Sequence, residues 1–313
     1  MAAPKIIFLD RATVGDVSLA PIAALGDLIC YDRTIPSDVD ARIADAEVII
    51  TNKVRIGRSE MKAAPRLRLI CIAATGMNNV DLEAAAEFGI PVRNVAGYST
   101  ESVVQTTFAH ILSLAGRLAA FDRTVKSGEY SRSGLFTDAS LPFHELCGHR
   151  IGIIGMGTIG RRVAAVAEAF GMEVVYFPTS GIAHESRYPA LGLDELLATS
   201  DIVSIHAPLN ERTLGLIQLP QLRRMKPTAI LVNAGRGGIV DEADLATALN
   251  EGALAGAGLD VYTAEPLPEE SPLLQIDRPE QLSLTPHTAW ASAEARERLI
   301  RSIAGNIRET LTL

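Results

Sequence analysis

Short apolar runs alternate with amphipathic segments over the first hundred residues of the chain. Five runs rich in branched apolar residues predict β-strands, and three segments between them carry apolar residues at helical spacing. Strands that alternate with helices are typical of a parallel sheet with helices on its faces, so we expect a small α/β domain here. The predicted strands are Lys5–Asp10, Leu28–Asp32, Glu47–Asn52, Leu67–Thr75 and Pro91–Val95, and the predicted helices are Ser37–Ala46, Ser59–Ala64 and Asp81–Phe88.

A second group of apolar runs begins at residue 150, after the long apolar segment Ser99–Ala120. That segment is predicted to form a helix that passes between two domains. Residues 127–148, rich in Gly, Ser and Phe, are interpreted as a surface excursion or an oligomer contact. Residues 292–311 predict an amphipathic helix. Six strands with intervening helices match a dinucleotide-binding sheet, and they are predicted at Arg150–Gly155, Glu173–Phe177, Ile202–His206, Thr228–Asn233, Ala255–Val261 and Leu282–Thr285.

Composition narrows the classes of function. The 313 residues suit two domains better than one. A net charge of -8 argues against a nucleic-acid partner, which would attract a basic surface. We expect a cytoplasmic protein with no membrane partner, because no apolar stretch is long enough to cross a bilayer and no signal-peptide profile is present. Cys30, Cys71 and Cys147 have no metal-ligand spacing and are interpreted as reduced thiols, with a catalytic cysteine as the alternative.

The stretch from Arg150 to Gly160, R-I-G-I-I-G-M-G-T-I-G, combines a buried strand with a glycine-rich turn and the start of a helix. Gly155, Gly157 and Gly160 have the G-x-G-x-x-G spacing, in which bare backbone lets an anion approach the N–H groups of the helix. Glycines also mark ordinary strand-to-helix turns. Because the strand and the helix are both predicted around this motif, we favour dinucleotide binding.

Three ionisable side chains follow the last three predicted strands. Arg236 lies in N-A-G-R-G-G, Glu265 in L-D-V-Y-T-A-E-P and His287 in L-T-P-H-T-A-W. In a parallel sheet ligands bind beyond the carboxyl ends of the strands, so the three are expected to lie near one another. Each alone has an ordinary interpretation as a surface arginine, a loop acid or a structural histidine. Together they form a usable catalytic set, with an imidazole for proton exchange, a carboxylate that fixes its tautomer and a guanidinium that binds carboxylates.

The first domain offers one matching feature in A-A-T-G-M-N-N-V-D, residues 73–81. This segment ends a predicted strand and enters a predicted helix through a glycine turn. Its backbone N–H groups are expected to form a nest for a carboxylate. A simple strand-to-helix connection is the alternative.

These motifs together resemble one family, the D-isomer-specific 2-hydroxyacid dehydrogenases. The resemblance extends from Thr51 to Ile307. Within it, residues 70–99 and the segment around Trp290 are most similar to glycerate dehydrogenases, also called hydroxypyruvate reductases. It is carried by A-T-G-M-N-N-V-D at 74–81, V-R-N-V-A-G-Y-S at 92–99, G-M-G-T-I-G at 155–160, H-A-P at 206–208, N-A-G-R-G at 233–237, D-V-Y-T-A-E-P at 260–266 and P-H-T-A-W at 286–290.

The resemblance implies an α/β fold with two doubly wound parallel-sheet lobes. A flavodoxin-like substrate lobe is expected over residues 1–98, completed by 290–313, and a Rossmann dinucleotide-binding domain over 99–289. Members of the family close a cleft between the two lobes and are usually dimers, so a homodimer is expected.

The resemblance also implies roles for individual residues. Arg236 binds and polarises the 2-oxo acid, and His287 is the acid/base with Glu265 as its partner. The backbone at Thr75 and Gly76 grips the substrate carboxylate beside Met77. No metal is implied. The implied cofactor-binding residues are Gly155, Met156, Gly157, Thr158, Ile159, Gly160, His206, Ala207, Pro208, Thr213, Ala234, Gly235, Arg236, Asp260 and His287.

Two departures from the family pattern concern the cofactor and the active site. Members that prefer NAD carry an acid at the end of the second Rossmann strand, where this chain reads Y-F-P-T-S-G at 176–181. No arginine follows closely and Arg187 is too far along, so NAD and NADP both remain open. Gln105 stands where many relatives have Glu, a change expected to alter the electrostatics of the active site without abolishing activity.

The sequence thus predicts hydride transfer between a nicotinamide cofactor and a small 2-oxo or 2-hydroxy acid such as hydroxypyruvate, glyoxylate or pyruvate. A nicotinamide-sensing binding module, as in corepressor-like relatives, is the alternative from another class. Within the fold, reductases of bulkier 2-oxo acids or of phosphite are lesser alternatives.

Overall fold

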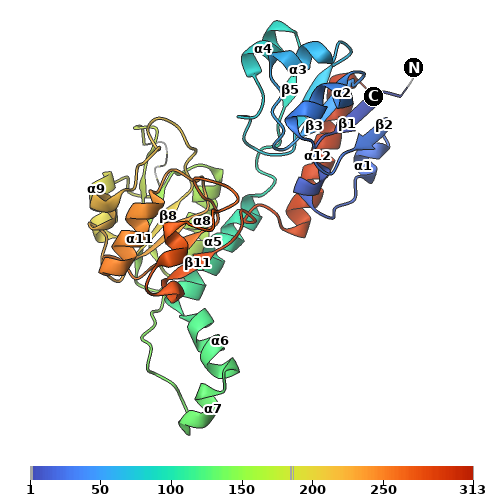
Figure 1. Ribbon diagram of the computed structural model, residues 1–313. Helices are drawn as coiled ribbons and strands as arrows, with labels where there is room; N and C mark the ends of the chain where they lie inside the picture. Colours follow the sequence, from blue (N-terminus) through green and yellow to red (C-terminus); the bar gives the residue numbers. More distant parts are fainter. Residues whose placement is uncertain (1–2, 184, 186, 313) are drawn as a thin grey trace. The chain divides into compact units, whose positions relative to one another are not determined.

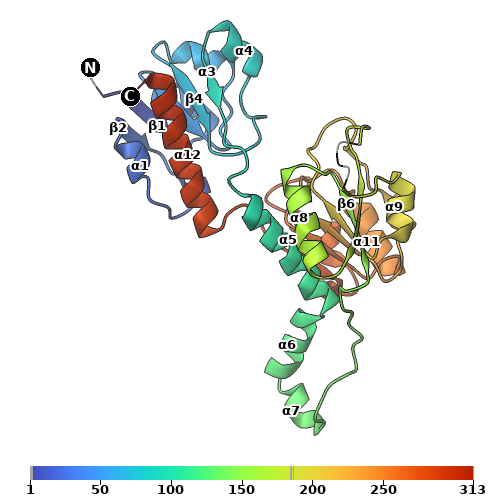
Figure 2. The same ribbon diagram turned by 180° about the vertical axis from the view of Figure 1, so that it is seen from behind.

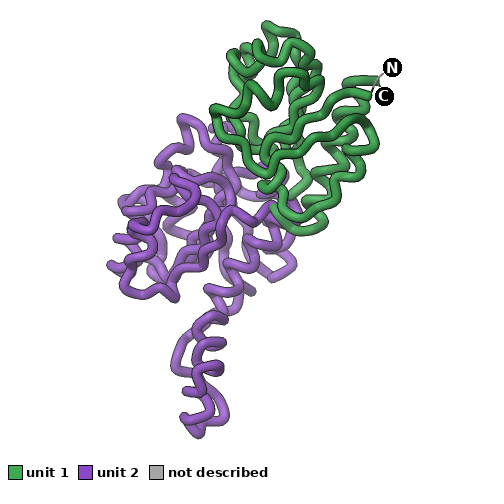
Figure 3. Tube along the Cα trace, turned by 45° about the vertical axis from the view of Figure 1, so that its right-hand side comes forward, with its two compact units in different colours: residues 1–99, 291–313 green, residues 100–290 purple. Residues whose placement is uncertain are grey.

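The computed structural model describes residues 3–183, 185 and 187–312. It separates into two compact units, unit 1 with residues 1–99 and 291–313 and unit 2 with residues 100–290 (Figure 3). These limits lie one residue away from the domain boundaries expected at 98/99 and 289/290.

Unit 1 is built on a five-stranded sheet in which all neighbours pair in parallel, in the order β2-β1-β3-β4-β5 (Figure 1). This is the flavodoxin-like order, so the expected fold of this lobe is confirmed. Strands β3 and β4 at its centre are fully buried and consist mostly of branched residues, as expected for strands covered on both faces. The strands are β1 Lys5–Phe8, β2 Asp27–Cys30, β3 Val48–Thr51, β4 Leu69–Ile72 and β5 Val92–Arg93.

The helices of unit 1 include one from the far end of the chain. Helix α12, Ala293–Leu311, packs against β4 and α1 and buries the apolar face that includes Leu299, Ile303 and Ile307. The segment predicted as one helix at 37–46 instead begins with a 3-10 turn and continues as α2. The other helical elements are η1 Arg11–Val14, α1 Ala20–Ala23, η2 Pro36–Asp38, α2 Val39–Ile43, α3 Arg58–Ala63 and α4 Leu82–Glu87.

Unit 2 contains a six-stranded parallel sheet in the order β11-β10-β9-β8-β6-β7. Helices α5 and α8 pack on one face, and α9, α10 and α11 pack on the other (Figure 2). The connections change face between β6 and β8, which makes this position the topological switch point. The strands are β6 Arg150–Ile154, β7 Glu173–Phe177, β8 Ile202–Ile205, β9 Ile230–Asn233, β10 Gly256–Leu259 and β11 Leu282–Leu284.

One strand of the Rossmann order is nearly absent. A parallel bridge joins Tyr176 of β7 to Ala190, and the N–H of Leu191 donates to the carbonyl oxygen of Tyr176 over 2.9 Å. This bridge occupies the place of the third strand in the order 3-2-1-4-5-6, and β11 adds a strand at the other edge. Five of the six predicted strands therefore occupy positions 1, 2, 4, 5 and 6 of the Rossmann order, and the last one is an additional edge strand.

The single long helix predicted over 99–120 is interrupted near its end. Helix α5 ends at Ala115, and Gly116 and Arg117 separate it from α6. Arg117 adopts φ 53°, a left-handed conformation that ends a right-handed helix. Helices α6 and α7 then extend away from the sheet of unit 2 (Figure 1). The helical elements of unit 2 are α5 Thr100–Ala115, α6 Leu118–Lys126, α7 Glu129–Ser133, α8 Thr158–Ala169, α9 Leu193–Thr199, α10 Leu219–Leu222, α11 Glu242–Glu251, η3 Pro272–Gln275 and η4 Pro279–Gln281.

Candidate active site in unit 2

The glycine-rich turn after β6 is shaped by close contacts at two of its three glycines. Gly155 has φ 96°, and a Cβ there would lie 2.9 Å from the backbone nitrogen of Ala207. A Cβ on Gly160 would lie 2.2 Å from the carbonyl oxygen of Gly155. Neither position accepts a side chain, so the turn brings β6, α8 and the end of β8 together at the switch point.

Gly157 has a different environment. A Cβ there would meet no atom within 4 Å, and no side chain caps the N-terminus of α8. The first N–H groups of the helix therefore have no side-chain acceptor and lie beside bare backbone. This is the arrangement that a dinucleotide pyrophosphate requires, so the residues present fit the cofactor that the glycine spacing implies.

His206 lies at the end of β8, beside the glycine turn. Its Nε2 atom lies 2.8 Å from Ser204 Oγ, and burial lowers the pKa of the imidazole to about 4. Within the described residues its buried Nδ1 has no hydrogen-bond partner. The ring is thus neutral at physiological pH and directed into its own strand, which leaves the backbone of residues 206–208 as the part available to a cofactor.

Arg236 is held on a tight turn after β9. The side chain of Asn233 accepts the N–H of Gly235 over 3.0 Å and donates to the carbonyl oxygen of Arg236 over 2.9 Å. A Cβ on Gly237 would lie 1.8 Å from the carbonyl oxygen of Tyr262, so this turn packs directly on the segment after β10. Among the described residues no carboxylate lies within ion-pair distance of the exposed Arg236 guanidinium, which suits it to an anionic ligand.

Glu265 and His287 form a hydrogen-bonded pair. Oε2 of Glu265 lies 2.7 Å from Nδ1 of His287, while Oε1 accepts the backbone N–H of Tyr262 over 3.0 Å. The two side chains are 33% and 27% exposed, so both remain accessible to a ligand. A carboxylate at Nδ1 holds that proton and leaves Nε2 as the exchanging atom.

Asp260 fixes the segment that carries His287. His287 has φ 54°, uncommon for a residue with a side chain, and donates its backbone N–H to the carbonyl oxygen of Asp260 over 2.8 Å. The Asp260 carboxylate, 1% exposed, accepts the N–H of Thr288 over 2.8 Å and that of Ala289 over 2.9 Å. The hydroxyl of Thr285 donates to the same carboxylate over 2.6 Å.

A buried histidine of α5 supports this network, and the sequence analysis missed it. His110 Nε2 lies 3.2 Å from Thr285 Oγ1 and its Nδ1 lies 2.8 Å from Ser283 Oγ. Burial lowers the pKa of His110. A polar residue on the buried face of an apolar helix was the available signal.

The comparisons with known proteins agree with this geometry. The family model for the NAD binding domain of D-isomer specific 2-hydroxyacid dehydrogenases matches residues 108–289. The chain belongs to the D-isomer-specific 2-hydroxyacid dehydrogenase family. It is 36% identical to a hydroxypyruvate reductase of Blautia hydrogenotrophica, over 98% of this chain and 97% of that protein. It is 35% identical to a glycerate dehydrogenase of Methylorubrum extorquens, over 97% and 95%.

A reductase of known structure has the same fold. The NADPH-dependent glyoxylate/hydroxypyruvate reductase of Sinorhizobium meliloti, in complex with NADP and malonate, superposes with a TM-score of 0.84 at 27% identity. The match covers 99% of this chain and 94% of that chain. Membership of the family and a nicotinamide cofactor, NAD or NADP, are therefore established for this dehydrogenase.

The 73–81 segment of this dehydrogenase follows β4 in unit 1. Thr75 Oγ1 donates to the carbonyl oxygen of Val95 over 3.0 Å, and Asn94 Nδ2 donates to the carbonyl oxygen of Thr75 over 2.6 Å. In the described part of the chain the backbone N–H groups of Gly76 and Met77 have no hydrogen-bond partner. The segment is thus braced from one side and keeps two donors for an anion, as a nest requires.

Asp10, which follows β1, anchors the loop at residues 52–54 of unit 1. The sequence pattern did not indicate this role. Its carboxylate, 4% exposed, accepts the N–H groups of Asn52, Lys53 and Val54 over 2.6–3.2 Å. Burial raises the pKa of Asp10, and these hydrogen bonds act against the rise. The residue is a loop anchor, because its carboxylate is consumed by backbone donors.

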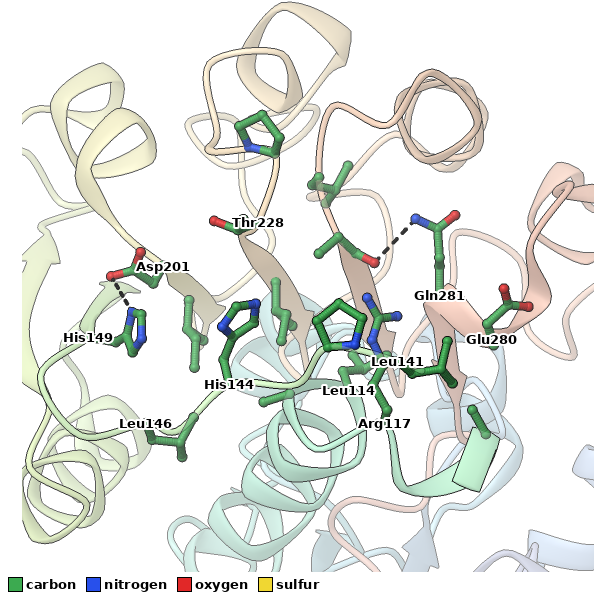
Figure 4. Close-up of a pocket in the computed structure, with 18 of the residues that line it drawn as sticks. Leu114, Arg117, Leu141, His144, Leu146, His149, Asp201, Thr228, Glu280 and Gln281 are labelled. Carbon is green, nitrogen blue, oxygen red and sulfur yellow. Dashed lines mark hydrogen bonds and ion pairs between the residues drawn. The ribbon is translucent and has the colours of Figure 1, made fainter. Parts of the chain in front are cut away.

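A cavity of about 610 Å³ lies at the opposite end of the strands of unit 2 (Figure 4). Its walls include Leu114, Leu146 and the first residues of β8 and β9, and His149 Nδ1 lies 3.3 Å from Asp201 at its rim. Ligands of open parallel sheets bind at the carboxyl ends of the strands. The cavity is therefore separate from the candidate active site.

None of the described helices combines the length and apolar character needed to cross a membrane. No group of three or more His, Cys, Asp or Glu side chains in the described ranges is arranged to hold a metal ion.

Proposed function

We propose that the protein catalyses reversible hydride transfer between a nicotinamide cofactor and a small 2-oxo or 2-hydroxy acid. Hydroxypyruvate, glyoxylate and pyruvate are the leading substrates, in keeping with the names of the hydroxypyruvate reductase and the glycerate dehydrogenase that resemble it. The Glu265–His287 pair, held at the carboxyl ends of β10 and β11, is the observation that carries the proposal.

The proposed mechanism divides the work among three side chains. The bound nicotinamide supplies the hydride in the reductive direction. Arg236 binds the oxo acid through its planar guanidinium and draws electron density onto the carbonyl oxygen. His287, holding one proton at Nδ1 against Glu265, donates its Nε2 proton to that oxygen as the alcohol forms. In the oxidative direction neutral His287 removes the same proton.

The remaining site residues have proposed supporting roles. The N–H groups of Gly76 and Met77, with Thr75, bind the substrate carboxylate. The bare backbone from Gly155 to Gly160 and the N-terminus of α8 bind the pyrophosphate. The other cofactor contacts proposed from the family resemblance lie at Met156, Gly157, Thr158, Ile159, His206, Ala207, Pro208, Thr213, Ala234, Gly235, Arg236, Asp260 and His287.

The test is a steady-state panel of hydroxypyruvate, glyoxylate, pyruvate and longer oxo acids, each with NADH and with NADPH. His287→Ala should lower kcat by about 100-fold or more, the usual contribution of a general acid. Cofactor binding, followed by quenching of protein fluorescence, should stay nearly intact. His144→Ala is the matched control. His144 is exposed and lies at the opposite end of the strands of unit 2 from His287, so this variant should turn over normally. Unchanged turnover in His287→Ala would reject the assignment.

A nicotinamide-sensing module is the second candidate. The complete Arg–Glu–His set does not separate it from an enzyme, because some sensing relatives keep the set. Tight cofactor binding together with silence across the whole panel of oxo acids is the outcome that would favour the sensor.

We also propose a cytoplasmic homodimer in which residues 118–143 of unit 2 contact a second copy. Leu135, Phe136 and Phe143 are 63%, 97% and 61% exposed, an amount of apolar surface that a monomer rarely keeps in one segment. Phe136→Ser should shift the mass in light scattering from twice 33.4 kDa toward 33.4 kDa. Phe88→Ser, at an exposed phenylalanine of unit 1, should leave it unchanged.

A further inference from the structure

The turn at the end of β7 carries hydroxyl groups where a carboxylate selects NAD. Strand β7 ends at Phe177, twenty residues after Gly157, and a turn closes when the N–H of Gly181 donates to the carbonyl oxygen of Pro178 over 2.9 Å. In Rossmann domains an acid at this distance binds the ribose hydroxyls of NAD, and it would repel a 2′-phosphate. Thr179 and Ser180 occupy the turn instead, so repulsion is removed.

Arg212 reaches this turn from the loop after β8. Its Nη1 donates to the carbonyl oxygen of Ser180, thirty-two residues away in sequence. A Cβ built on Gly181 would lie 3.4 Å from the same nitrogen. The loops after β7 and β8 lie on opposite sides of the switch point, across which a dinucleotide binds. The fold therefore delivers the guanidinium that the sequence around β7 lacks.

The backbone of Arg212 is held by its neighbours. Asn210 Oδ1 accepts the N–H of Arg212 over 2.9 Å. Thr213, fully buried, donates its hydroxyl to the carbonyl oxygen of Pro208 over 2.7 Å and accepts the N–H of Asn210 over 2.9 Å. The side chain of Arg212 thus projects from an ordered turn, which lowers the entropy lost on gripping a ligand.

Two other arginines, one on α8 and one on the segment after β7, are already paired with carboxylates. Arg161 pairs with Glu185 at 3.2 Å, and Arg187 pairs with Glu168 at 2.7 Å. Across residues 3–183, 185 and 187–312, no carboxylate lies within ion-pair distance of Arg212. Its positive charge is therefore available to an anion, and its exposure lets the anion approach.

We propose that this chain prefers NADPH to NADH, and that Arg212 binds the 2′-phosphate together with the hydroxyl of Thr179. The hydroxyl of Ser180 instead donates to the carbonyl oxygen of Ile182 over 3.1 Å and holds the turn in shape. The inference rests on the proposed function, because it takes the dinucleotide site in unit 2 as given. Two N–H groups of a guanidinium match two oxygens of a phosphomonoester, and the hydroxyl of Thr179 is the further donor.

The decisive measurement uses adenosine fragments and needs no turnover. Calorimetric titration of the intact protein with 2′,5′-ADP and with 5′-AMP compares ligands that differ only in the 2′-phosphate. We expect 2′,5′-ADP to bind at least about 10-fold more tightly, as charge-assisted hydrogen bonds predict. Arg212→Ala should abolish the difference and change the affinity for 5′-AMP by less than about 2-fold. The preference should shrink as salt rises.

Two further variants make the test independent of one substitution. Thr179→Asp places a carboxylate in the turn and should reverse the preference in favour of 5′-AMP, with kcat/KM shifting toward NADH. Arg187→Ala removes the same charge from a paired arginine nearby and should preserve the preference.

The contrary outcomes are distinct from one another. Equal affinity of the wild-type protein for the two fragments would overturn the NADPH preference and leave the proposed function standing. If Arg212→Ala weakened the binding of 2′,5′-ADP and of 5′-AMP by the same factor, the guanidinium would contact the adenosine part that both share. That result would overturn the phosphate site. Failure of both fragments to bind the wild-type protein would overturn this inference together with the dinucleotide site.

Discussion

The backbone N–H of His287 donates a hydrogen bond to the carbonyl oxygen of Asp260 over 2.8 Å. The carboxylate of the same aspartate accepts the next two N–H groups along the chain. The left-handed conformation of His287 is thus fixed by one buried residue on the neighbouring strand. The orientation of the imidazole therefore depends on these backbone hydrogen bonds to Asp260 as well as on the hydrogen bond to Glu265.

Asp260→Asn should therefore damage catalysis and stability together. An amide group turns one of the two acceptors into a donor that faces a backbone N–H. We expect a loss of about 1–3 kcal/mol in the free energy of unfolding and a fall in kcat that exceeds the change in cofactor affinity. Urea unfolding and steady-state kinetics measure the two effects. Thr285→Val removes a single donor to Asp260 and should lower the free energy of unfolding and kcat by less. A normal kcat in Asp260→Asn would show that the Asp260 carboxylate does not orient His287.

Two glycines of the 155–160 turn should respond differently to the same added methyl group. Gly160→Ala pushes a Cβ to 2.2 Å from the carbonyl oxygen of Gly155, so the protein should unfold several degrees earlier. Gly157→Ala meets no atom within 4 Å and should keep its melting temperature. It should nevertheless weaken cofactor binding by about 10-fold or more, because the methyl group occupies the approach of the pyrophosphate. Thermal unfolding with and without NADPH separates the two cases.

Acid should destabilise the protein through His206. Its pKa in the folded state is about 4, below the ordinary value of 6.5. As pH falls below 6.5 the unfolded chain binds a proton that the folded chain refuses, so stability is lost between about pH 7 and pH 4. The loss from this residue should be roughly 2–3 kcal/mol. His206→Gln should flatten that part of the stability profile measured by urea unfolding, whereas His144→Ala should not.

The junction between α5 and α6 should tolerate glycine better than its native residue. Arg117 adopts φ 53°, which glycine reaches without strain. Arg117→Gly is expected to raise the free energy of unfolding by about 0.5–1 kcal/mol, and Arg117→Val to lower it by at least as much. Chemical denaturation of both variants checks the sign, and a less stable Arg117→Gly protein would show that the arginine side chain contributes more than the backbone costs.

The parallel sheets could be predicted because buried strands leave uninterrupted apolar runs. Residues 69–72, Leu-Ile-Cys-Ile, are an example, and all four are buried. The helix over 99–120 was extended too far, since its apolar spacing continues past a left-handed residue that no local pattern reveals. The third Rossmann strand escaped detection because a single bridge at Ala190 carries almost no apolar signal.

At the site, residues that follow strands directly were within reach of sequence reasoning. Arg236, Glu265 and His287 each follow a predicted strand, and the structure brings Glu265 and His287 into contact. Arg212 and His110 were not within reach. Their partners lie thirty-two and 173 or more residues away in sequence, and only the fold brings them together.

Gly258 has an effect that extends beyond its own strand. A Cβ at this position of β10 would lie 2.6 Å from the Cβ of His110, so α5 packs against the sheet too closely to leave room for a side chain here. A methyl group on Gly258 would push α5 away from β10 and separate His110 from Ser283 and Thr285. The hydrogen bond from Thr285 to Asp260 would then weaken as well. The spacing between a helix and a strand thereby governs how firmly a proton-transferring group is aimed.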